Sequence, residues 1–306
     1  YNLTMGIQCK GIANKSKKGE ILDIYYPCIE FGEKKISNEI IKSINSSQEL
    51  VEISWSDEDL EKPIENVEGA YLKLHLLSNK FVLPNSINLY GLFSNIPNVV
   101  WTNQGPVSID EIDNKLHESK LNGNDLYIKS VDKFPCLTDY IVPRKVRIAD
   151  VSRVRLGAYL SEGTTVMHEG FVNFNAGTLG KAMIEGRISA GVIIGNNSDI
   201  GGGASTMGTL SGGNDKKISI GENCLLGANS GIGISLGDNC TVEAGLYVTA
   251  GTKITMLDNG VSKIMKAVEL SGICNILYYR NSTNGKVIAT SNNKISDLNK
   301  ELHSND

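Results

Sequence analysis

The segment between Leu156 and Thr255 contains few side chains able to transfer a proton. Its glutamates are Glu162, Glu169, Glu185, Glu222 and Glu243. Glu185 precedes Arg187 by two residues, and residues two apart on a strand point to the same side. Arg187 could then hold a substrate carboxylate while Glu185 takes a proton. The alternative interpretation is a surface ion pair, which contributes about 0–1 kcal/mol to stability.

The histidines limit which kinds of catalytic site this segment can form. The chain has His75, His117, His168 and His303, and only His168 lies in this segment. A catalytic zinc site of the three-histidine type is therefore excluded there. His168 is a second candidate for a general base, although a lone histidine is more often a packing or surface residue.

A repeat of six residues positions these side chains. Upstream, Leu160, Val166, Val172, Thr178 and Ile184 keep the same step. The clear units are IGNNSD (194–199), IGGGAS (200–205), IGENCL (220–225), LGANSG (226–231), LGDNCT (236–241), VEAGLY (242–247) and VTAGTK (248–253). Glycine at the second place allows a turn where a Cβ would clash, and the aliphatic residue at the first place points inward. The repeat predicts a β-helix of roughly five to six coils, three units to a coil.

The repeat is interrupted between Thr206 and Ser219, where Gly208, Gly212 and Gly213 occur. Such a loop on a rigid scaffold is either a harmless insertion or a lid over a site. Both interpretations stay open at this stage.

The flanking segments read differently. Residues 1–138 are predicted to form an α/β domain, with a strand at 21–27 ended by Pro27 and helices at 37–44 and 67–77. A capping-box pattern at 108–111 predicts a further helix start, and the acidic run 57–59 predicts a solvated loop or a helix start. Residues 139–258 form the β-helix, and 259–306 a C-terminal extension with strands at 276–279 and 286–289.

Composition limits the functional classes. With 41% hydrophobic and 21% charged residues the chain is globular, and a net charge of -4 without a basic stripe argues against nucleic acid. The six cysteines form no CxxC pair, which favours reduced thiols in the cytoplasm. The polar, lysine-rich stretch 1–20 is no signal peptide, and no stretch is long and apolar enough to span a membrane.

Five motifs together resemble the 2,3,4,5-tetrahydropyridine-2,6-dicarboxylate (tetrahydrodipicolinate) N-succinyltransferase family, in the branch typical of actinobacteria and pseudomonads. They are VNFNAGTLG (172–180), MIEGRISAG (183–191), GGGASTMGTLSGG (201–213), LLGANSG (225–231) and VEAGLYVTAGT (242–252). The N-terminal domain is similar more loosely, at 21–27 and 98–106. The resemblance covers most of residues 6–282 and implies a left-handed β-helix.

The resemblance implies an acyltransferase that moves succinyl from succinyl-CoA to the amine of ring-opened tetrahydrodipicolinate, in diaminopimelate and lysine synthesis. It further implies a homotrimer with active sites between neighbouring β-helices. Glu185 matches the family's catalytic carboxylate, which acts as a general base or carries a transient acyl anhydride. We expect the base, because an amine attacking a thioester needs only deprotonation and orientation.

The other implied residues fall into two groups. Arg187 would clamp a ligand carboxylate. The positions matching those that line the extended acyl-CoA are Gly202, Ser205, Ala228, Glu243, Ala244 and Gly251, and those matching the tail that meets the CoA phosphates are Lys266, Arg280, Asn281 and Ser282. Lys263 is an additional charge nearby. For each glycine, backbone geometry alone is the other interpretation.

A structural magnesium ion is also implied, although none is required for the chemistry. Glu169 matches the family's glutamate ligand, but Ser152 stands where the family has an aspartate, with Asp150 two residues earlier. Because a hard cation prefers carboxylate oxygen, this substitution weakens the expected site. Two functions remain as alternatives: an N-acetyltransferase acting on the same acceptor, and a trimeric scaffold or regulator without activity.

Overall fold

The computed structural model describes residues 6–38, 45–213, 215–258 and 261–292 of the 306-residue chain. It divides into two compact units, one made of residues 1–77 and 81–135, the other of 78–80 and 136–306. The strands after residue 259 belong to the second unit. The division into domains at 138 and 258 stays a prediction.

The first unit is built on an antiparallel sheet of order β3-β2-β1-β4. Its strands are β1 (Gly6–Lys15), β2 (Ile21–Phe31), β3 (Lys34–Ser37) and β4 (Gln48–Ser56). The strand predicted at 21–27 is confirmed, but it continues past Pro27 to Phe31. The pairing shifts between Lys10 and Ile12 on β1, opposite this proline. Proline, which lacks an N–H, is tolerated at such a bulge.

The rest of the first unit contains helices and a smaller sheet of order β6-β5-β7. The elements are the 3-10 helix η1 (Asp57–Glu61), α1 (Val67–Ser78), α2 (Leu92–Asn95), β5 (Val99–Thr102), β6 (Gly105–Ser108), α3 (Ile112–Asn122) and β7 (Ile128–Asp132). The helix predicted at 67–77 is confirmed. In the helix predicted at 37–44, Ser37 instead ends β3, and residues 39–44 lie outside the described residues.

The capping-box pattern at 108–111 correctly predicts that a helix begins there. Its prediction that a side chain caps the helix is wrong. Helix α3 has Glu111 as its N-cap and no side-chain cap, because Ser108 is the last residue of β6. The acidic run 57–59 does begin a helix, η1, where the Asp59 carboxylate accepts from the Ser56 N–H at 2.7 Å and pairs with Lys62 at 2.7 Å.

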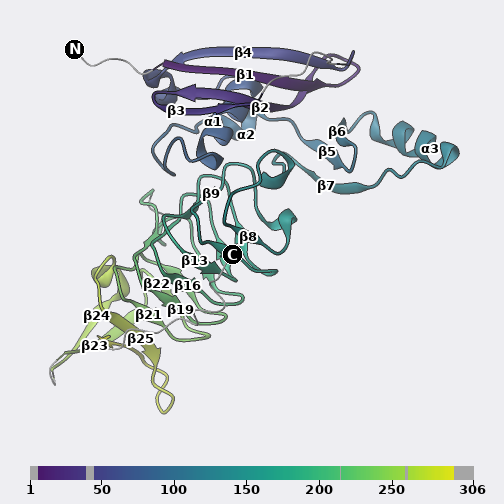
Figure 1. Ribbon diagram of the computed structural model, residues 1–306. Coiled ribbons are helices and arrows are strands. Elements are labelled where there is room, and N and C mark those ends of the chain that lie inside the picture. The colour runs from purple at the N-terminus through teal and green to yellow at the C-terminus, as the bar shows by residue number, and fades with distance from the viewer. Residues whose placement is uncertain (1–5, 39–44, 214, 259–260, 293–306) are drawn as a thin grey trace, which may run out of the picture. The chain divides into compact units, whose positions relative to one another are not determined.

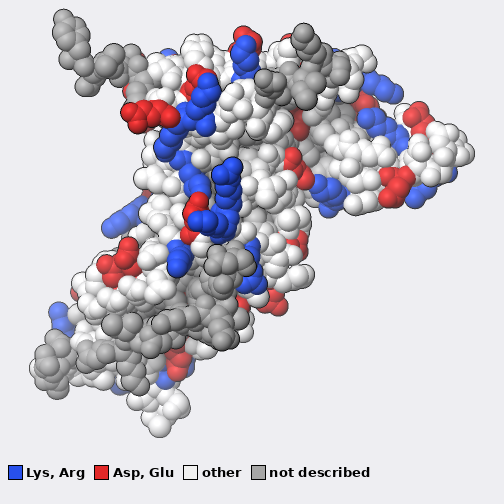
Figure 2. Space-filling model, viewed as in Figure 1, with Lys and Arg blue, Asp and Glu red and all other residues white. Residues whose placement is uncertain are grey.

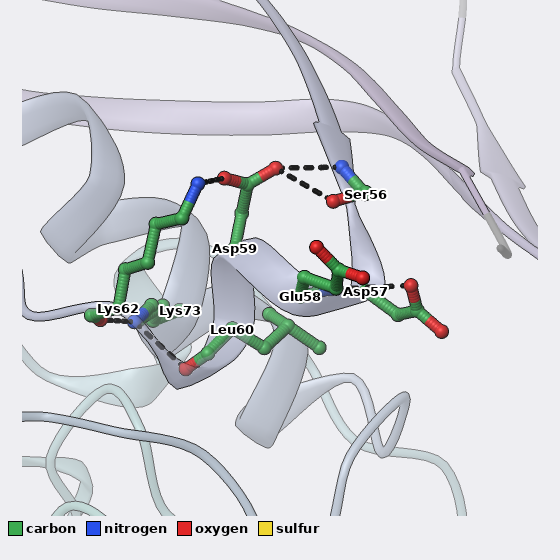
Figure 3. A network of polar contacts seen from close by, with 7 residues as sticks. All are labelled: Ser56, Asp57, Glu58, Asp59, Leu60, Lys62 and Lys73. Carbon is green, nitrogen blue, oxygen red and sulfur yellow. Dashed lines mark hydrogen bonds and ion pairs between the residues drawn. The ribbon is translucent and has the colours of Figure 1, made fainter.

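A buried lysine holds these pieces of the first unit together (Figure 3). The Lys73 ammonium donates to the carbonyls of Leu60 and Lys62 at 3.0 and 2.6 Å. It also donates to the Asn88 carbonyl at 2.8 Å. The side chain is 1% exposed, and burial lowers the pKa of Lys73 to about 8. Three acceptors match the three donors of an ammonium, so the charge is buried with its hydrogen bonds satisfied.

The second unit is a parallel β-helix whose coils have three faces (Figure 1). It begins with the 3-10 helices η2 (Leu137–Asp139) and η3 (Val151–Arg153). We call the strands β8 (Arg147–Ile148), β10 (Thr165–Val166), β13 (Ala182–Ile184), β16 (Ser198–Ile200), β19 (Leu225–Leu226) and β21 (Thr241–Val242) the first face. The second face is β11 (Phe171–Val172), β14 (Arg187–Ile188), β17 (Ser205–Thr206), β20 (Gly231–Gly233) and β22 (Tyr247–Thr249). The third face is β9 (Tyr159–Leu160), β12 (Gly177–Thr178), β15 (Ile193–Ile194) and β18 (Ser219–Ile220).

The aliphatic residue that opens each six-residue unit points inward, as the repeat predicts. On the first face Val166, Ile184, Ile200, Leu226 and Val242 stack coil on coil, each 0% exposed. Each coil's backbone pairs with the next in register, so the column buries a continuous core while the hydrogen bonds are satisfied.

The corners between faces depend on residues that tolerate a positive φ or a close approach of the next coil's backbone. Asn197, Asn223, Asn239 and Asn275 adopt φ of 54–61° at one corner of successive coils, and their amides join in pairs, Asn197 to Asn223 at 2.8 Å and Asn239 to Asn275 at 3.0 Å. A Cβ built on Gly227 would lie 2.5 Å from the Ala244 nitrogen. The predicted role of the second-place glycine is confirmed here, because the next coil leaves no room for a side chain.

The final strands extend the first face beyond the coils. They are β23 (Lys253–Asp258), β24 (Val261–Lys266), β25 (Ile276–Arg280) and β26 (Val287–Ser291), with the 3-10 helix η4 (Ala267–Leu270). They confirm the strands predicted at 276–279 and, within one residue at its start, at 286–289. Strand β25 pairs with β21 of the coils. None of the helices in the described ranges has the length and apolar character needed to cross a membrane.

The described surface carries both signs of charge side by side. On the face drawn in Figure 2, lysine and arginine side chains lie among aspartate and glutamate side chains and form no continuous basic stripe. This distribution agrees with the net charge of -4.

Close approach of coils gives a direct test of the packing. Gly177 has φ of 154°, and a Cβ there would lie 1.8 Å from the Tyr159 carbonyl oxygen of the preceding coil. We expect Gly177→Ala to reduce the free energy of unfolding by more than about 2 kcal/mol, measured by urea denaturation. The control is Gly245→Ala, where φ is 73° but no atom lies within 4 Å. Equal losses in the two variants would contradict this account.

Candidate active site

Glu185 lies at a corner of the β-helix. It follows β13 and precedes β14, in the turn that joins the first face to the second; we call the stack of these turns the first corner. Its N–H donates to the Ile200 carbonyl at 2.8 Å, which fixes its backbone on the next coil. The side chain is half-buried. The coil therefore sets the position of the predicted catalytic carboxylate.

The carboxylates of two successive coils reach the same turn. A Cβ built on Gly202 would lie 3.8 Å from Oε2 of Glu185 and 3.8 Å from Oε2 of Glu169. Gly202 thus leaves open the space toward which both carboxylates point. The structure brings together three residues that the sequence analysis assigned to separate roles.

Arg187 begins β14 on the second face and does not form the ion pair considered as its alternative role. Its Nη2 and Nε donate to the Ser205 hydroxyl at 2.7 and 3.2 Å, and Ser205 is its ladder partner on β17. Within the described residues the other guanidinium N–H groups contact no acceptor. The fork is exposed and oriented by Ser205, as binding of a carboxylate requires.

The first corner continues through the turns of the lower coils. Ala228 and Ala244 occupy the places equivalent to Gly202, and both are exposed. Glu243, beside Ala244, accepts from the Arg280 N–H through its Oε2 at 2.7 Å. Glu243 therefore anchors the C-terminal strands to the corner, a role the sequence analysis did not assign to it.

A line of unused backbone donors follows this corner. The N–H groups of Gly202, Ala228 and Ala244 find no acceptor among the described residues. Exposed N–H groups on rigid turns can bind amide carbonyls of a ligand or a developing oxyanion. The residues at these places are small, and Ala228 and Ala244 are exposed while Gly202 is half-buried.

The remaining predicted residues lie elsewhere in the second unit. Gly251 is exposed in the turn after β22, on the opposite edge of the second face. Lys266 ends β24, where its N–H donates to Glu269 at 2.9 Å, and Lys263 is exposed on the same strand. Asn281 and Ser282 follow Arg280 in the turn after β25, where Asn281 Oδ1 accepts from the Thr283 N–H at 2.9 Å.

The predicted magnesium site is not assembled by the described residues of one chain. Asp150 accepts from the Ser152 hydroxyl at 2.6 Å and from its N–H at 3.0 Å, and this bonding lowers the pKa of Asp150. Glu169 instead points toward Gly202. The described residues hold no group of three metal-binding side chains. His168, the alternative base, is exposed in the same turn as Glu169.

One titratable residue near Glu185, Asp199, was not predicted from the sequence. Asp199 is the ladder partner of Met183 on the first face and is half-buried. Burial, together with the charge of Glu185, raises the pKa of Asp199 to about 6. Its place inside a repeat unit made it resemble an ordinary outward-facing position, and only the coil stacking reveals its neighbour.

Asp199 should make stability depend on pH. Its pKa is higher in the folded than in the unfolded state, so its contribution to stability is lost as pH rises from about 4 to about 6. We expect Asp199→Asn to be more stable than the wild type at pH 8 by about 1 kcal/mol after solvent screening, and the difference to shrink at pH 4. Thermal unfolding of both proteins at pH 8 and at pH 4 measures this difference in stability. A difference that is the same at both would contradict the assignment.

A groove on the second unit lies away from these residues. It has a volume of about 450 Å³ and runs along the third face and its neighbouring corner, past Ile193, Ser219, Leu236 and Asp238. None of the predicted site residues lines it. The chemistry-bearing side chains and this groove therefore occupy different faces of the coil.

Comparison with known proteins identifies the relatives of the chain. A family described as the hexapeptide repeat of succinyl-transferase matches residues 217–250, and one described as tetrahydrodipicolinate N-succinyltransferase middle matches residues 96–135. A Vibrio cholerae protein named 2,3,4,5-tetrahydropyridine-2,6-dicarboxylate N-succinyltransferase is 53% identical over 266 residues, 86% of this chain and 77% of its own length. A Pseudomonas aeruginosa protein of the same name is 59% identical over 236 residues, 76% of this chain and 69% of its own.

A solved structure agrees with these matches. A crystal structure from Campylobacter jejuni, described as a candidate 2,3,4,5-tetrahydropyridine-2-carboxylate N-succinyltransferase, superposes with a TM-score of 0.84 at 31% identity, covering 96% of this chain and 94% of that one. The predicted fold class, an α/β domain followed by a left-handed hexapeptide β-helix, is confirmed. The chain belongs to the 2,3,4,5-tetrahydropyridine-2,6-dicarboxylate N-succinyltransferase family.

Proposed function

We propose that the chain transfers succinyl from succinyl-CoA to the amine of L-2-amino-6-oxopimelate, the ring-opened form of tetrahydrodipicolinate. The products are N-succinyl-2-amino-6-oxopimelate and CoA, in diaminopimelate and lysine synthesis. The observation that carries the proposal is the first corner, where a coil-fixed Glu185 lies beside open N–H groups and next to the Arg187 fork. The names of the relatives favour a succinyl over an acetyl donor, and an enzyme over an inactive scaffold.

In the proposed mechanism Glu185 is the general base. It takes a proton from the acceptor nitrogen as that nitrogen forms a bond to the thioester carbon, and the carbon–sulfur bond then breaks. The proton passes to the departing CoA sulfur, so the base is regenerated. A corner N–H such as that of Gly202 stabilises the oxyanion, while Arg187 holds a carboxylate of a substrate. General-base catalysis accounts for about 10²–10⁴-fold of the rate.

The line of free donors suits the pantetheine arm of acyl-CoA, whose amides need partners. From β13 to β25 the sheet order is β13-β16-β19-β21-β25, four strand spacings or about 20 Å. This separation supports the proposal that Arg280, with Asn281 and Ser282, contacts the phosphates of an extended donor. Lys266 and Lys263 on β24 would add positive charge beyond them.

Three further features are proposals supported by the family resemblance. The active sites lie between neighbouring chains of a homotrimer, so that the exposed first corner faces a second chain. A magnesium ion held through Glu169 would have a structural or regulatory role, because acyl transfer does not need it. The site of action is the cytoplasm, in keeping with the absence of disulfides among the described residues.

The test is a steady-state assay of Glu185→Gln with succinyl-CoA and the ring-opened acceptor. We expect kcat to fall by about 10²–10⁴-fold, because the amide cannot take a proton. The control is Glu222→Gln, an exposed corner glutamate on another edge of the coil, which should keep wild-type activity.

Two results would count against the proposal. Full activity of Glu185→Gln would exclude its role as base or acyl carrier. Faster turnover of acetyl-CoA than of succinyl-CoA by the wild type would exclude succinyl-CoA as the preferred acyl donor. A succinyl group trapped on Glu185 in a single turnover would instead replace the base mechanism with the acyl anhydride.

A further inference from the structure

The loop that interrupts the repeat is held against the coil. We define the arm as residues 207–213 and 215–218. At its base Ile218 donates to the Gly208 carbonyl at 3.4 Å and Leu210 donates to the Lys216 carbonyl at 2.9 Å. Thr209 and Lys217 form an antiparallel bridge. The arm is thus a short hairpin with its own backbone pairing.

One residue, Ser211, bonds the arm to two lower coils through its backbone and its side chain. The Ser211 N–H donates to the Gly233 carbonyl at 2.9 Å, at the end of β20. The Ser211 hydroxyl accepts from the Ala250 N–H at 2.6 Å, in the turn after β22. Ser211 therefore bonds both coils, and we call it the tether of the arm.

The coil has a matching recess for this contact. A Cβ built on Gly233 would lie 2.7 Å from Met207 Sδ and 2.9 Å from Ser211 Oγ. Glycine at this place lets the arm approach the end of β20 without displacing these two side chains. The fit involves residues from the loop and from the repeat, which argues against a harmless insertion.

The tether lies across the second face from Glu185. Strand β20 has three residues, so the first corner and the arm border the same face about 10 Å apart. Between them the face carries Arg187 and Ser205, and Ala250 adjoins Gly251, the acyl-CoA position on that edge. The arm therefore forms the second border of the face on which the proposed donor lies.

We propose that Ser211 is a positioning residue for acyl transfer, which fixes the arm as a wall of the acyl-CoA site. This inference rests on the proposed function for its ligand. Ser211 touches neither reacting group in the account above and acts through the arm. Its loss should weaken donor binding and leave the chemical step at Glu185 largely unchanged.

The experiment measures CoA binding by calorimetry, together with kcat and KM for succinyl-CoA. Ser211→Ala should raise the Kd for CoA and the KM about fivefold, the effect of one lost hydrogen bond, with kcat within about twofold. Ser211→Thr keeps the hydroxyl and should restore both values. Trypsin should cut after Lys216 or Lys217 faster in Ser211→Ala than in the wild type.

The control is Ser161→Ala, which loses a comparable bond, from its hydroxyl to the Thr178 carbonyl at 2.8 Å, away from the arm. An unchanged CoA affinity in Ser211→Ala, or an equal loss in Ser161→Ala, would overturn the inference. If Ser211→Ala weakens CoA binding as expected but the wild type transfers no succinyl, the role of Ser211 in CoA binding is supported and the proposed function is wrong.

Discussion

The structure depends on the close contact between successive coils. Each coil lies one strand spacing from the next, and at corner positions such as Gly227 the Ala244 backbone of the next coil leaves no room for a side chain. This constraint fixes every turn along the corner relative to its neighbours. A carboxylate placed on one turn, such as Glu185, is therefore held in a constant relation to donors on the turns below it.

The same constraint explains how the site can bind an extended ligand without a deep pocket. The turns at Gly202, Ala228 and Ala244 repeat at the coil spacing and leave their N–H groups without protein partners in the described structure. The repeat that builds the core thus also produces a regular line of donors on the surface. The chemical groups that a regular coil does not contain come from residues that depart from the repeat. These are the carboxylate of Glu185, the guanidinium of Arg187 and the arm contact of Ser211.

Much of the fold was predictable because the repeat has a strict physical cause. The inward position of Ile184 and Ile200 follows from the six-residue period, and the turns follow from glycine. The cap of α3 was wrong because sheet pairing took Ser108 into β6. Pro27 was misread as a strand end because a bulge, which depends on the partner strand, accommodates it.

The site was less predictable than the scaffold. Glu185 and Arg187 could be named from their spacing and the family motifs, yet the actual partner of Arg187 is Ser205, eighteen residues away. Asp199 and the Ser211 tether could not be found, because each depends on which coils stack and on where a loop returns. Such contacts are set by three-dimensional register, which local patterns do not encode.

The most direct test of the central claim is a crystal structure of the protein with CoA bound. The account predicts density for the pantetheine arm along the first corner, past Ala244, Ala228 and Gly202, with the sulfur next to Glu185. Density in the 450 Å³ groove of the third face, at Ile193, Ser219 and Leu236, with the first corner empty, would contradict it.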